Sequence, residues 1–180
     1  SIGRSFAESL QKGLRSMEIG LTGLNEVEIV GAPNHDSIEA ALSQHYPNRI
    51  LYVAQAIRHA MSLKKIQKSS GFDPWFLDQI EMLVKFEEGL REKGLPSNKS
   101  DFLTVKKLGF SDARIGELVN LNTNAGTLKR KELGVNPIYK RVDTCAAEFS
   151  SQTSYMYSSY EGDGLNEPEN EVNPSLAKKV

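Results

Sequence analysis

The segment from Asp73 to Gly94 constrains the fold more than any other part of the chain. Asp73 is a residue type that caps helix N-termini, Pro74 suits the first helical position, and Gly94 is a typical C-terminal signal. At about 100° per residue, the apolar residues between them cover roughly 220° of the helix surface, against the ~100° stripe of an ordinary surface helix. The pattern predicts a central helix over 73–93 that is surrounded on most sides. These apolar residues are Trp75, Phe76, Leu77, Ile80, Met82, Leu83, Val84, Phe86 and Leu90.

Six further segments carry helical signals. Capping residues and apolar spacing predict helices over 6–19, 36–45, 49–61, 101–108, 112–120 and 124–133. Ser5 and Glu8 form a capping box at the start of the first of these. The helix over 49–61 has an apolar arc as wide as that of 73–93, so we expect these two helices to dominate the core. The predicted capping residues of the others are Asp36, Ser100, Ser111 and Thr123.

The chain changes character after Pro137. Residues 138–149 mix β-branched, charged and aromatic side chains, and three tyrosines follow in a Ser-rich stretch over 150–160. We expect an extended strap lying across the helices, with its tyrosine rings buried. Residues 161–178 are rich in Gly, Asn, Glu and Pro, as in a linker. The sequence therefore predicts a mainly α, compact multi-helix domain around the helix over about 73–93, with an extended C-terminal strap and linker.

Composition limits the classes of function. The 22 Lys and Arg against 23 Asp and Glu leave a net charge of −1, which argues against a general polyanion binder. The single Cys excludes an internal disulfide framework, and with three His it also excludes a cysteine-rich zinc site. No apolar run approaches the ~20 residues that span a bilayer, and no secretory signal pattern is present. We expect a cytoplasmic protein without a membrane partner.

Motif searches give no catalytic constellation. The sequence lacks the GxxxxGK[ST] phosphate loop, GxGxxG, HExxH and GxSxG. His35, His45 and His59 have no metal-ligand spacing, so we interpret them as structural or solvent-facing. Cys145 could be a nucleophile, but no glycine-rich oxyanion turn accompanies it, and we favour a small packed hydrophobe.

The stretch Ser111–Leu133 imitates a DNA-reading helix-turn-helix, and a nucleic-acid-binding module is our alternative function. The competing interpretation is a helical hairpin whose basic face meets an acidic neighbour or solvent. We prefer the hairpin, because Gly126 in the second helix costs ~1 kcal/mol relative to Ala, and the rest of the chain cancels the local charge. From Lys99 to Arg141 nine basic residues stand against four acidic ones: Lys99, Lys106, Lys107, Arg114, Lys129, Arg130, Lys131, Lys140 and Arg141 against Asp101, Asp112, Glu117 and Glu132.

One run of thirteen residues is highly specific. Residues 137–149, Pro-Ile-Tyr-Lys-Arg-Val-Asp-Thr-Cys-Ala-Ala-Glu-Phe, closely resemble a signature of the carbamoyl phosphate synthetase large subunit, and residues 155–161 continue it. Residues 2–12 look like the end of that family's first ATP-grasp half. Residues 73–80 look like the long helix of the next domain, and residues 110–114 fit as well. The resemblance covers nearly the whole chain.

The resemblance implies a domain division. Residues 1–20 would be the C-terminal helix of the preceding carboxyphosphate (ATP-grasp) domain, residues 21–165 the helical oligomerisation domain, and residues 166–180 the linker to the second ATP-grasp half. The parent family is an ATP-dependent ligase that makes carbamoyl phosphate from bicarbonate, glutamine-derived ammonia and two ATP, for arginine and pyrimidine biosynthesis. Its ATP sites, with Mg²⁺ or Mn²⁺, lie outside the matched region.

The expected role of the segment is therefore structural. It would brace the two synthetase halves and mediate subunit contacts, with no active site of its own. We assign no catalytic, cofactor-binding or metal-ligating residue to it. The expected partners are the flanking ATP-grasp domains, the glutaminase small subunit and further copies of the chain, without nucleic acid.

Overall fold

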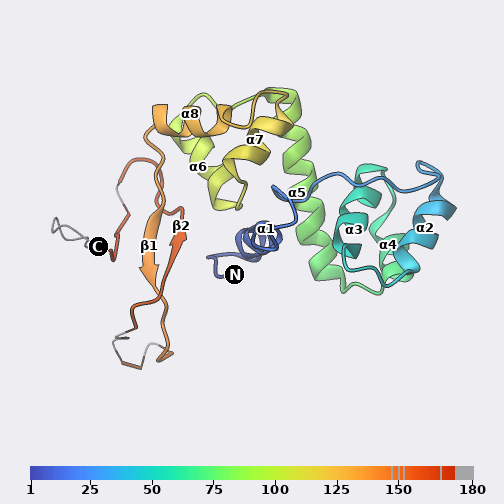
Figure 1. The fold of residues 1–180 in the computed structure, drawn as a ribbon, viewed down its shortest axis with the longest axis horizontal. Helices are drawn as coiled ribbons and strands as arrows, with labels where there is room; N and C mark the ends of the chain where they lie inside the picture. Colours follow the sequence, from blue (N-terminus) through green and yellow to red (C-terminus); the bar gives the residue numbers. More distant parts are fainter. Residues whose placement is uncertain (147, 150, 152, 167, 173–180) are drawn as a thin grey trace.

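The computed structural model describes residues 1–146, 148–149, 151, 153–166 and 168–172. Part of the predicted linker, residues 167 and 173–180, lies outside the described residues. The described chain is mainly α, as predicted, and ends in one two-stranded antiparallel ribbon (Figure 1). Its elements are α1 (Phe6–Ser16), α2 (His35–Ser43), α3 (Arg49–Arg58), α4 (Leu63–Ser70), α5 (Pro74–Lys93), α6 (Lys99–Lys107), α7 (Asp112–Leu118), α8 (Ala125–Glu132), β1 (Ile138–Arg141) and β2 (Met156–Ser159).

Helix α5 is central, as its apolar arc predicts. It contacts α1, α3, α4 and α7, and it stands between the group α2–α4 and the group α6–α8 (Figure 1). Asp73 caps it by accepting a hydrogen bond from the Trp75 backbone N–H at 2.9 Å, and Gly94 ends it at φ 77°. Its side chains Leu77, Ile80, Leu83 and Val84 are buried in the main hydrophobic cluster. The main hydrophobic cluster therefore packs against α5 from both sides of the helix.

The predicted width of the buried arc of α5 is wrong at its N-terminal end. Trp75 is 51% exposed and Phe76 41% exposed. Both rings contact Phe6 of α1, which leaves their outer edges in solvent. Later in the helix Glu87, for which no position is predicted from the sequence, is fully buried.

Helix α4 is absent from the sequence-based prediction. It is eight residues long and buries only Ile66 and Ser70, so few apolar positions mark it in the sequence. The helix predicted over 49–61 ends at Arg58, because Ala60 adopts φ 57° and the Met61 N–H returns to the Ala56 carbonyl at 3.1 Å. That pattern is a Schellman ending, with alanine in the left-handed position where glycine is usual.

Three predicted caps are also displaced. Asn34, not Asp36, caps α2, and Asn98, not Ser100, caps α6, because asparagine is as good a capping residue as aspartate or serine. Asn124 occupies the N-cap of α8 in place of Thr123, without a side-chain bond. The caps predicted at Ser5 and Ser111 are confirmed.

The predicted strap is the antiparallel pair β1–β2, with Ile138 opposite Ser159 and Arg141 opposite Met156. Strand β2 contacts α1, where Ser159 Oγ donates to Glu8 Oε2 at 3.3 Å and Lys12 Nζ donates to the Ser158 carbonyl. The far end of the ribbon projects beyond the helices (Figure 1). Tyr155 is consequently 75% exposed, so the expectation of a buried ring is wrong for this tyrosine, whereas Tyr157 and Tyr160 are half-buried and Tyr160 packs against the core.

Helices α7 and α8 form a hairpin whose close approach depends on Gly126. A Cβ atom built at Gly126 would lie 2.3 Å from the Asp112 carbonyl oxygen, so a larger residue cannot fit without backbone movement. A Cβ atom built at Gly89, inside α5, has nothing within 4 Å. A side chain is therefore excluded at Gly126 and has room at Gly89.

Opposite effects of alanine are expected at the two positions. Gly126→Ala should destabilise the fold by about 2 kcal/mol through overpacking. Gly89→Ala should stabilise it by about 0.5–1 kcal/mol, because alanine loses less backbone entropy in a helix. Urea unfolding followed by circular dichroism measures both, and equal effects of the two substitutions would contradict the close approach of α7 and α8.

Candidate functional site

The largest buried side chain of the described chain is that of Arg114, on α7. It is 2% exposed, and its guanidinium meets the carboxylate of Glu87 on α5 through two parallel hydrogen bonds, from Nε at 2.8 Å and from Nη2 at 2.9 Å. Its Nη1 also donates to Glu26 Oε2 at 2.8 Å. Paired bonds between a guanidinium and a carboxylate are among the strongest polar contacts in proteins and fix the relative orientation of the two groups.

Two further arginines complete this network, in which Glu87, Arg114 and Arg58 are buried or nearly so and Glu26 and Arg91 lie at the surface. Arg58 of α3 donates from Nη2 to Glu87 Oε2 at 2.7 Å and also reaches the Leu24 carbonyl. Arg91 of α5 pairs with Glu26. The network, which we define as Glu26, Arg58, Glu87, Arg91 and Arg114, thereby joins the loop after α1 to three helices, α3, α5 and α7.

The charges of the network balance when Glu117 is included. Its carboxylate lies 3.6 Å from Arg114 Nη1 and accepts a hydrogen bond from Thr22 Oγ1 at 2.7 Å. Three carboxylates therefore face three guanidiniums. This arrangement holds elements together and leaves no charge unmatched for a substrate.

The pKa values in the network follow from this pairing. Burial alone would raise the pKa of the Glu26 carboxyl, but the hydrogen bonds and charge of Arg114 outweigh it and lower that pKa to about 2. Burial alone would lower the pKa of Arg114, yet its bonds to Glu26 and Glu87 raise it above the ordinary value. Both groups are charged at neutral pH.

A second polar cluster surrounds Asp112 at the start of α7. Its carboxylate accepts from Lys106 Nζ at 2.6 Å and from Arg130 Nε at 2.8 Å. Burial lowers the pKa of Lys106, whose ammonium group lies 5.0 Å from the centre of the Tyr160 ring. Burial also raises the pKa of Tyr160 to about 12. This cluster joins α6, α7 and α8 to the chain after β2.

The two clusters decide between the interpretations of Ser111–Leu133. The structure shows the helical hairpin, with Lys129 and Arg130 paired with carboxylates, and Arg114 belongs to the core rather than to a basic surface. Of the nine basic residues counted between 99 and 141, the following five pair with carboxylates: Lys106, Arg114, Lys129, Arg130 and Lys140.

The three histidines and Cys145 do not come together in one site. His35 and His45 are exposed, and His59 is half-buried beside Gln55. Cys145 is partly exposed in the segment between the strands, 3.8 Å from Thr144 Oγ1, so the expectation of a packed hydrophobe is wrong.

Within the described ranges, no three His, Cys, Asp or Glu side chains gather as a metal site would need, and the carboxylates of both clusters are already paired with cations. Over the same residues, no helix combines the length and the apolar character that crossing a membrane demands.

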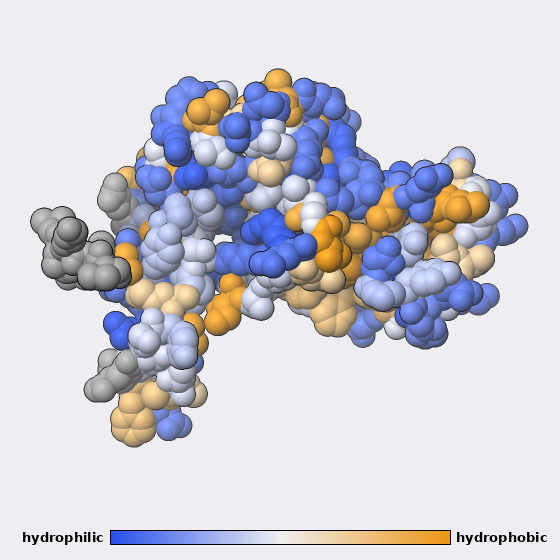
Figure 2. Space-filling view, viewed as in Figure 1, coloured by the Kyte–Doolittle hydropathy of each residue, from blue (hydrophilic) through white to orange (hydrophobic). Residues whose placement is uncertain are grey.

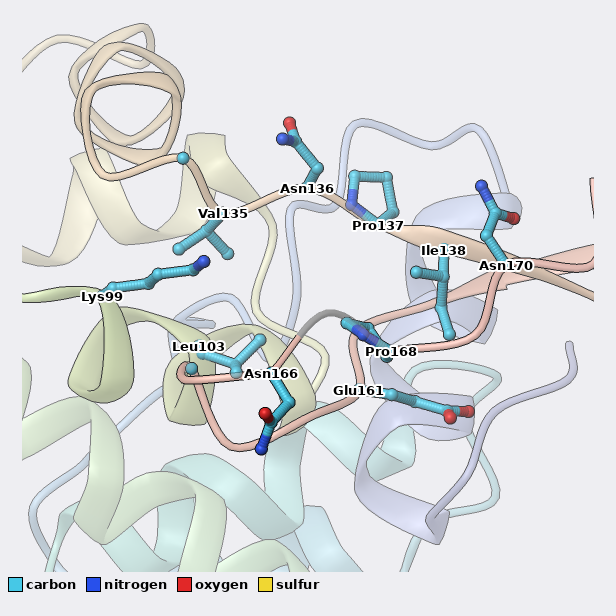
Figure 3. A pocket seen from close by; sticks show the side chains of 12 residues that line it. Lys99, Leu103, Val135, Asn136, Pro137, Ile138, Glu161, Asn166, Pro168 and Asn170 are labelled. Carbon is cyan, nitrogen blue, oxygen red and sulfur yellow. The ribbon is translucent and has the colours of Figure 1, made fainter.

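A pocket of about 200 Å³ lies between α6, the connection from α8 to β1, and residues 161–166 and 168–170 (Figure 3). Its two charged side chains, Lys99 and Glu161, stand on opposite sides of it. The Glu161 carboxylate pairs with Arg4 at 2.9 Å. The pocket thus brings no acid, base and nucleophile together.

The network was not identified from the sequence. Arg114 is one of the nine basic residues counted between 99 and 141, and no role is predicted for Glu87 from the sequence. One signal was available, because Glu87 falls three or four residues from Leu83, Val84 and Leu90, inside the apolar arc of the long helix. A charged residue at such a position needs a buried partner.

Removing the charge at position 87 tests the network. Glu87→Gln keeps the shape of the side chain but leaves the guanidinium of Arg114 buried against a neutral group, so we expect a loss of about 3 kcal/mol in unfolding free energy. Glu88→Gln, at the exposed neighbour, should change it by less than about 0.5 kcal/mol. Chemical denaturation at pH 7 measures both, and equal values would rule out the network as a source of stability.

The pKa of Glu26 makes part of the stability depend on pH. Because its folded pKa of about 2 lies below the ordinary 4.5, the unfolded chain binds a proton first as the pH falls. The contribution of Glu26 is therefore complete above pH 4.5 and is lost between pH 4.5 and 2. Urea unfolding at pH 7, 5, 4 and 3 should show the gap between the wild type and Glu26→Gln shrinking at acid pH, whereas a constant gap would contradict the assignment.

Comparison with known proteins confirms the resemblance. Residues 1–134 match the family model of the carbamoyl-phosphate synthetase large chain, oligomerisation domain. The carbamoyl phosphate synthase large chain of Brucella melitensis biotype 1 is 46% identical over 183 residues, that of Mesorhizobium japonicum 45% over 190, and that of Pseudomonas aeruginosa 42% over 182. Each alignment covers 100% of this chain but 16% of the relative. The chain therefore belongs to the carbamoyl-phosphate synthetase large-chain family and carries its oligomerisation domain.

Proposed function

We propose that this chain is a bracing segment of a carbamoyl phosphate synthase large chain, which holds the two synthetase halves in fixed register and has no active site of its own. The observation that carries the proposal is the buried network around Arg114 and Glu87, which joins four parts of the fold through paired charges. Such contacts tolerate few alternative geometries, because displacing either partner leaves a buried charge unpaired.

Rigidity of this kind suits a two-site ligase. An enzyme that passes a reactive intermediate between separate centres depends on their distance and orientation, and a misplacement of about 1 Å can lower a rate about 100-fold. Helix α5 has 20 residues, or about 30 Å of continuous rod. Its contacts with α1, α3, α4 and α7 prevent it from moving independently of the rest.

The activity and partners of the whole protein follow from its family as part of the same proposal. The parent would be a cytoplasmic ATP-dependent ligase that forms carbamoyl phosphate from bicarbonate, glutamine-derived ammonia and two ATP, for arginine and pyrimidine biosynthesis. ATP and Mg²⁺ or Mn²⁺ would bind in the flanking ATP-grasp domains. A glutaminase small subunit and further copies of the chain would be its partners, and the domain limits 1–20, 21–165 and 166–180 stay predictions.

A substitution in the full-length large chain tests the bracing role. Glu87→Gln should lower kcat for ammonia-dependent carbamoyl phosphate formation about 10-fold or more, because the two sites lose their fixed geometry. The KM for ATP should stay unchanged, because no ATP-binding group is altered. Glu88→Gln is the matched control and should behave as wild type.

Two results would contradict the proposal. One is a Glu87→Gln large chain that is less stable than the wild type but keeps the wild-type kcat. The other is carbamoyl phosphate formed by the 180-residue chain alone when it is supplied with ATP, Mg²⁺, bicarbonate and ammonia.

A further inference from the structure

Lys106, in the last turn of α6, is buried although lysine side chains ordinarily lie in water. Figure 2 shows a mainly hydrophilic surface over α6–α8, yet Lys106 is only 5% exposed. Its Nζ donates to the Phe110 carbonyl at 2.7 Å and to Asp112 Oδ1 at 2.6 Å. The same Nζ lies over the Tyr160 ring, 5.0 Å from the ring centre. Two polar acceptors and one aromatic face thus match the three donors of an ammonium group in number.

The ion pair with Asp112 does not by itself account for the burial of Lys106. The Asp112 carboxylate already accepts hydrogen bonds from Arg130 Nε at 2.8 Å and from Thr127 Oγ1 at 3.1 Å, so it has a cationic partner without the lysine. Taking a further ammonium group out of water carries a desolvation cost. A cation that is removed from water is, however, attracted to an aromatic face more strongly than an exposed one. The burial of Lys106 therefore strengthens its contact with Tyr160.

Tyr160 stands at the point where the pairing of the two strands stops. The last pair of the ribbon is Ile138 with Ser159, and Tyr160 is the next residue. Its ring packs between the main hydrophobic cluster and the buried cation. The next two residues contact the exposed side chains of Arg4 and Lys107, and exposed contacts of this kind contribute little. The direction of the chain beyond the ribbon therefore depends mainly on how the Tyr160 ring is held.

We infer that Lys106 is a positioning residue of the synthetase, which holds the Tyr160 ring and so fixes the direction in which the chain continues toward the second synthetase half. The inference rests on the proposed function, and it goes further because it names the contact that places the second half. A displaced second half would lose the reactive intermediate to water. The ATP spent on that intermediate would then give ADP and phosphate without carbamoyl phosphate.

The ATP consumed per carbamoyl phosphate formed tests the inference in the full-length large chain supplied with ammonia. The ratio should be about two in the wild type. It should rise about twofold or more in Tyr160→Leu, because leucine fills the space but offers no aromatic face to the cation. A substitution that only destabilised the enzyme would leave fewer active molecules and an unchanged ratio. A ratio of about two in Tyr160→Leu therefore overturns the inference.

Two control variants identify the property of the side chain that is needed. Tyr160→Phe keeps an aromatic face for the cation, so its ratio should stay at about two. Tyr155→Leu makes the same replacement as Tyr160→Leu at a tyrosine of the same segment that is 75% exposed, and it should also behave as wild type. A ratio raised in either control as much as in Tyr160→Leu contradicts a role for the contact with Lys106.

Removing the cation provides an independent variant, which decides the question if Tyr160→Leu fails to fold. Lys106→Met keeps an apolar side chain of similar length, and Asp112 keeps Arg130 as its partner. Its ratio should rise as in Tyr160→Leu, and the double variant should show no further rise, because both substitutions remove the same contact. A ratio of about two in Lys106→Met, or independent effects that add in the double variant, would overturn the inference.

The outcomes for positioning and for bracing are distinguishable. Unchanged ratios in Tyr160→Leu and Lys106→Met, together with a reduced kcat in Glu87→Gln, remove the positioning role and leave the bracing role. Raised ratios in both variants, together with a normal kcat in Glu87→Gln, remove the bracing role of the network and leave the positioning role of Lys106.

Discussion

The structure depends on the paired contact between Arg114 and Glu87. Each group is almost completely buried, and either one alone would carry a desolvation cost of several kcal/mol. The two must therefore be brought together whenever the core forms, and this requirement sets the position of α7 along α5. Glu26 and Arg58 extend the same requirement to the loop after α1 and to α3. Apolar packing alone would tolerate small shifts between these helices.

The remaining helices are positioned through this centre. Helix α8 lies against α7 because Gly126 allows its backbone to reach Asp112. The Asp112 carboxylate then accepts hydrogen bonds from Lys106 of α6 and Arg130 of α8. A series of close contacts thus runs from α8 through α7 and α5 to α3. No single helix in that series can move without separating charges or backbone atoms that are already in contact, which favours a bracing role over a flexible one.

Local signals in the sequence were sufficient for much of the fold and insufficient for the network. The start and end of α5 followed from Asp73, Pro74 and Gly94, because capping is decided within a few residues. Helix α4 was missed because eight residues with two apolar positions carry little periodicity, although Ser62 and Gly71 flank it. The partners of Glu87 lie 27 and 29 residues away, so they depend on tertiary packing. The exposure of Trp75 likewise depends on which helices happen to cover it.

The contacts between α1 and β2 have a mechanical consequence. Arg4, Glu8 and Lys12 meet residues 157–161 of the chain, so two segments about 150 residues apart are fastened side by side. A force that pulled these two segments apart would act first on those polar contacts and would leave the helices between them unstretched. Tension in the polypeptide therefore passes directly from one end of the helical part to the other through these polar contacts.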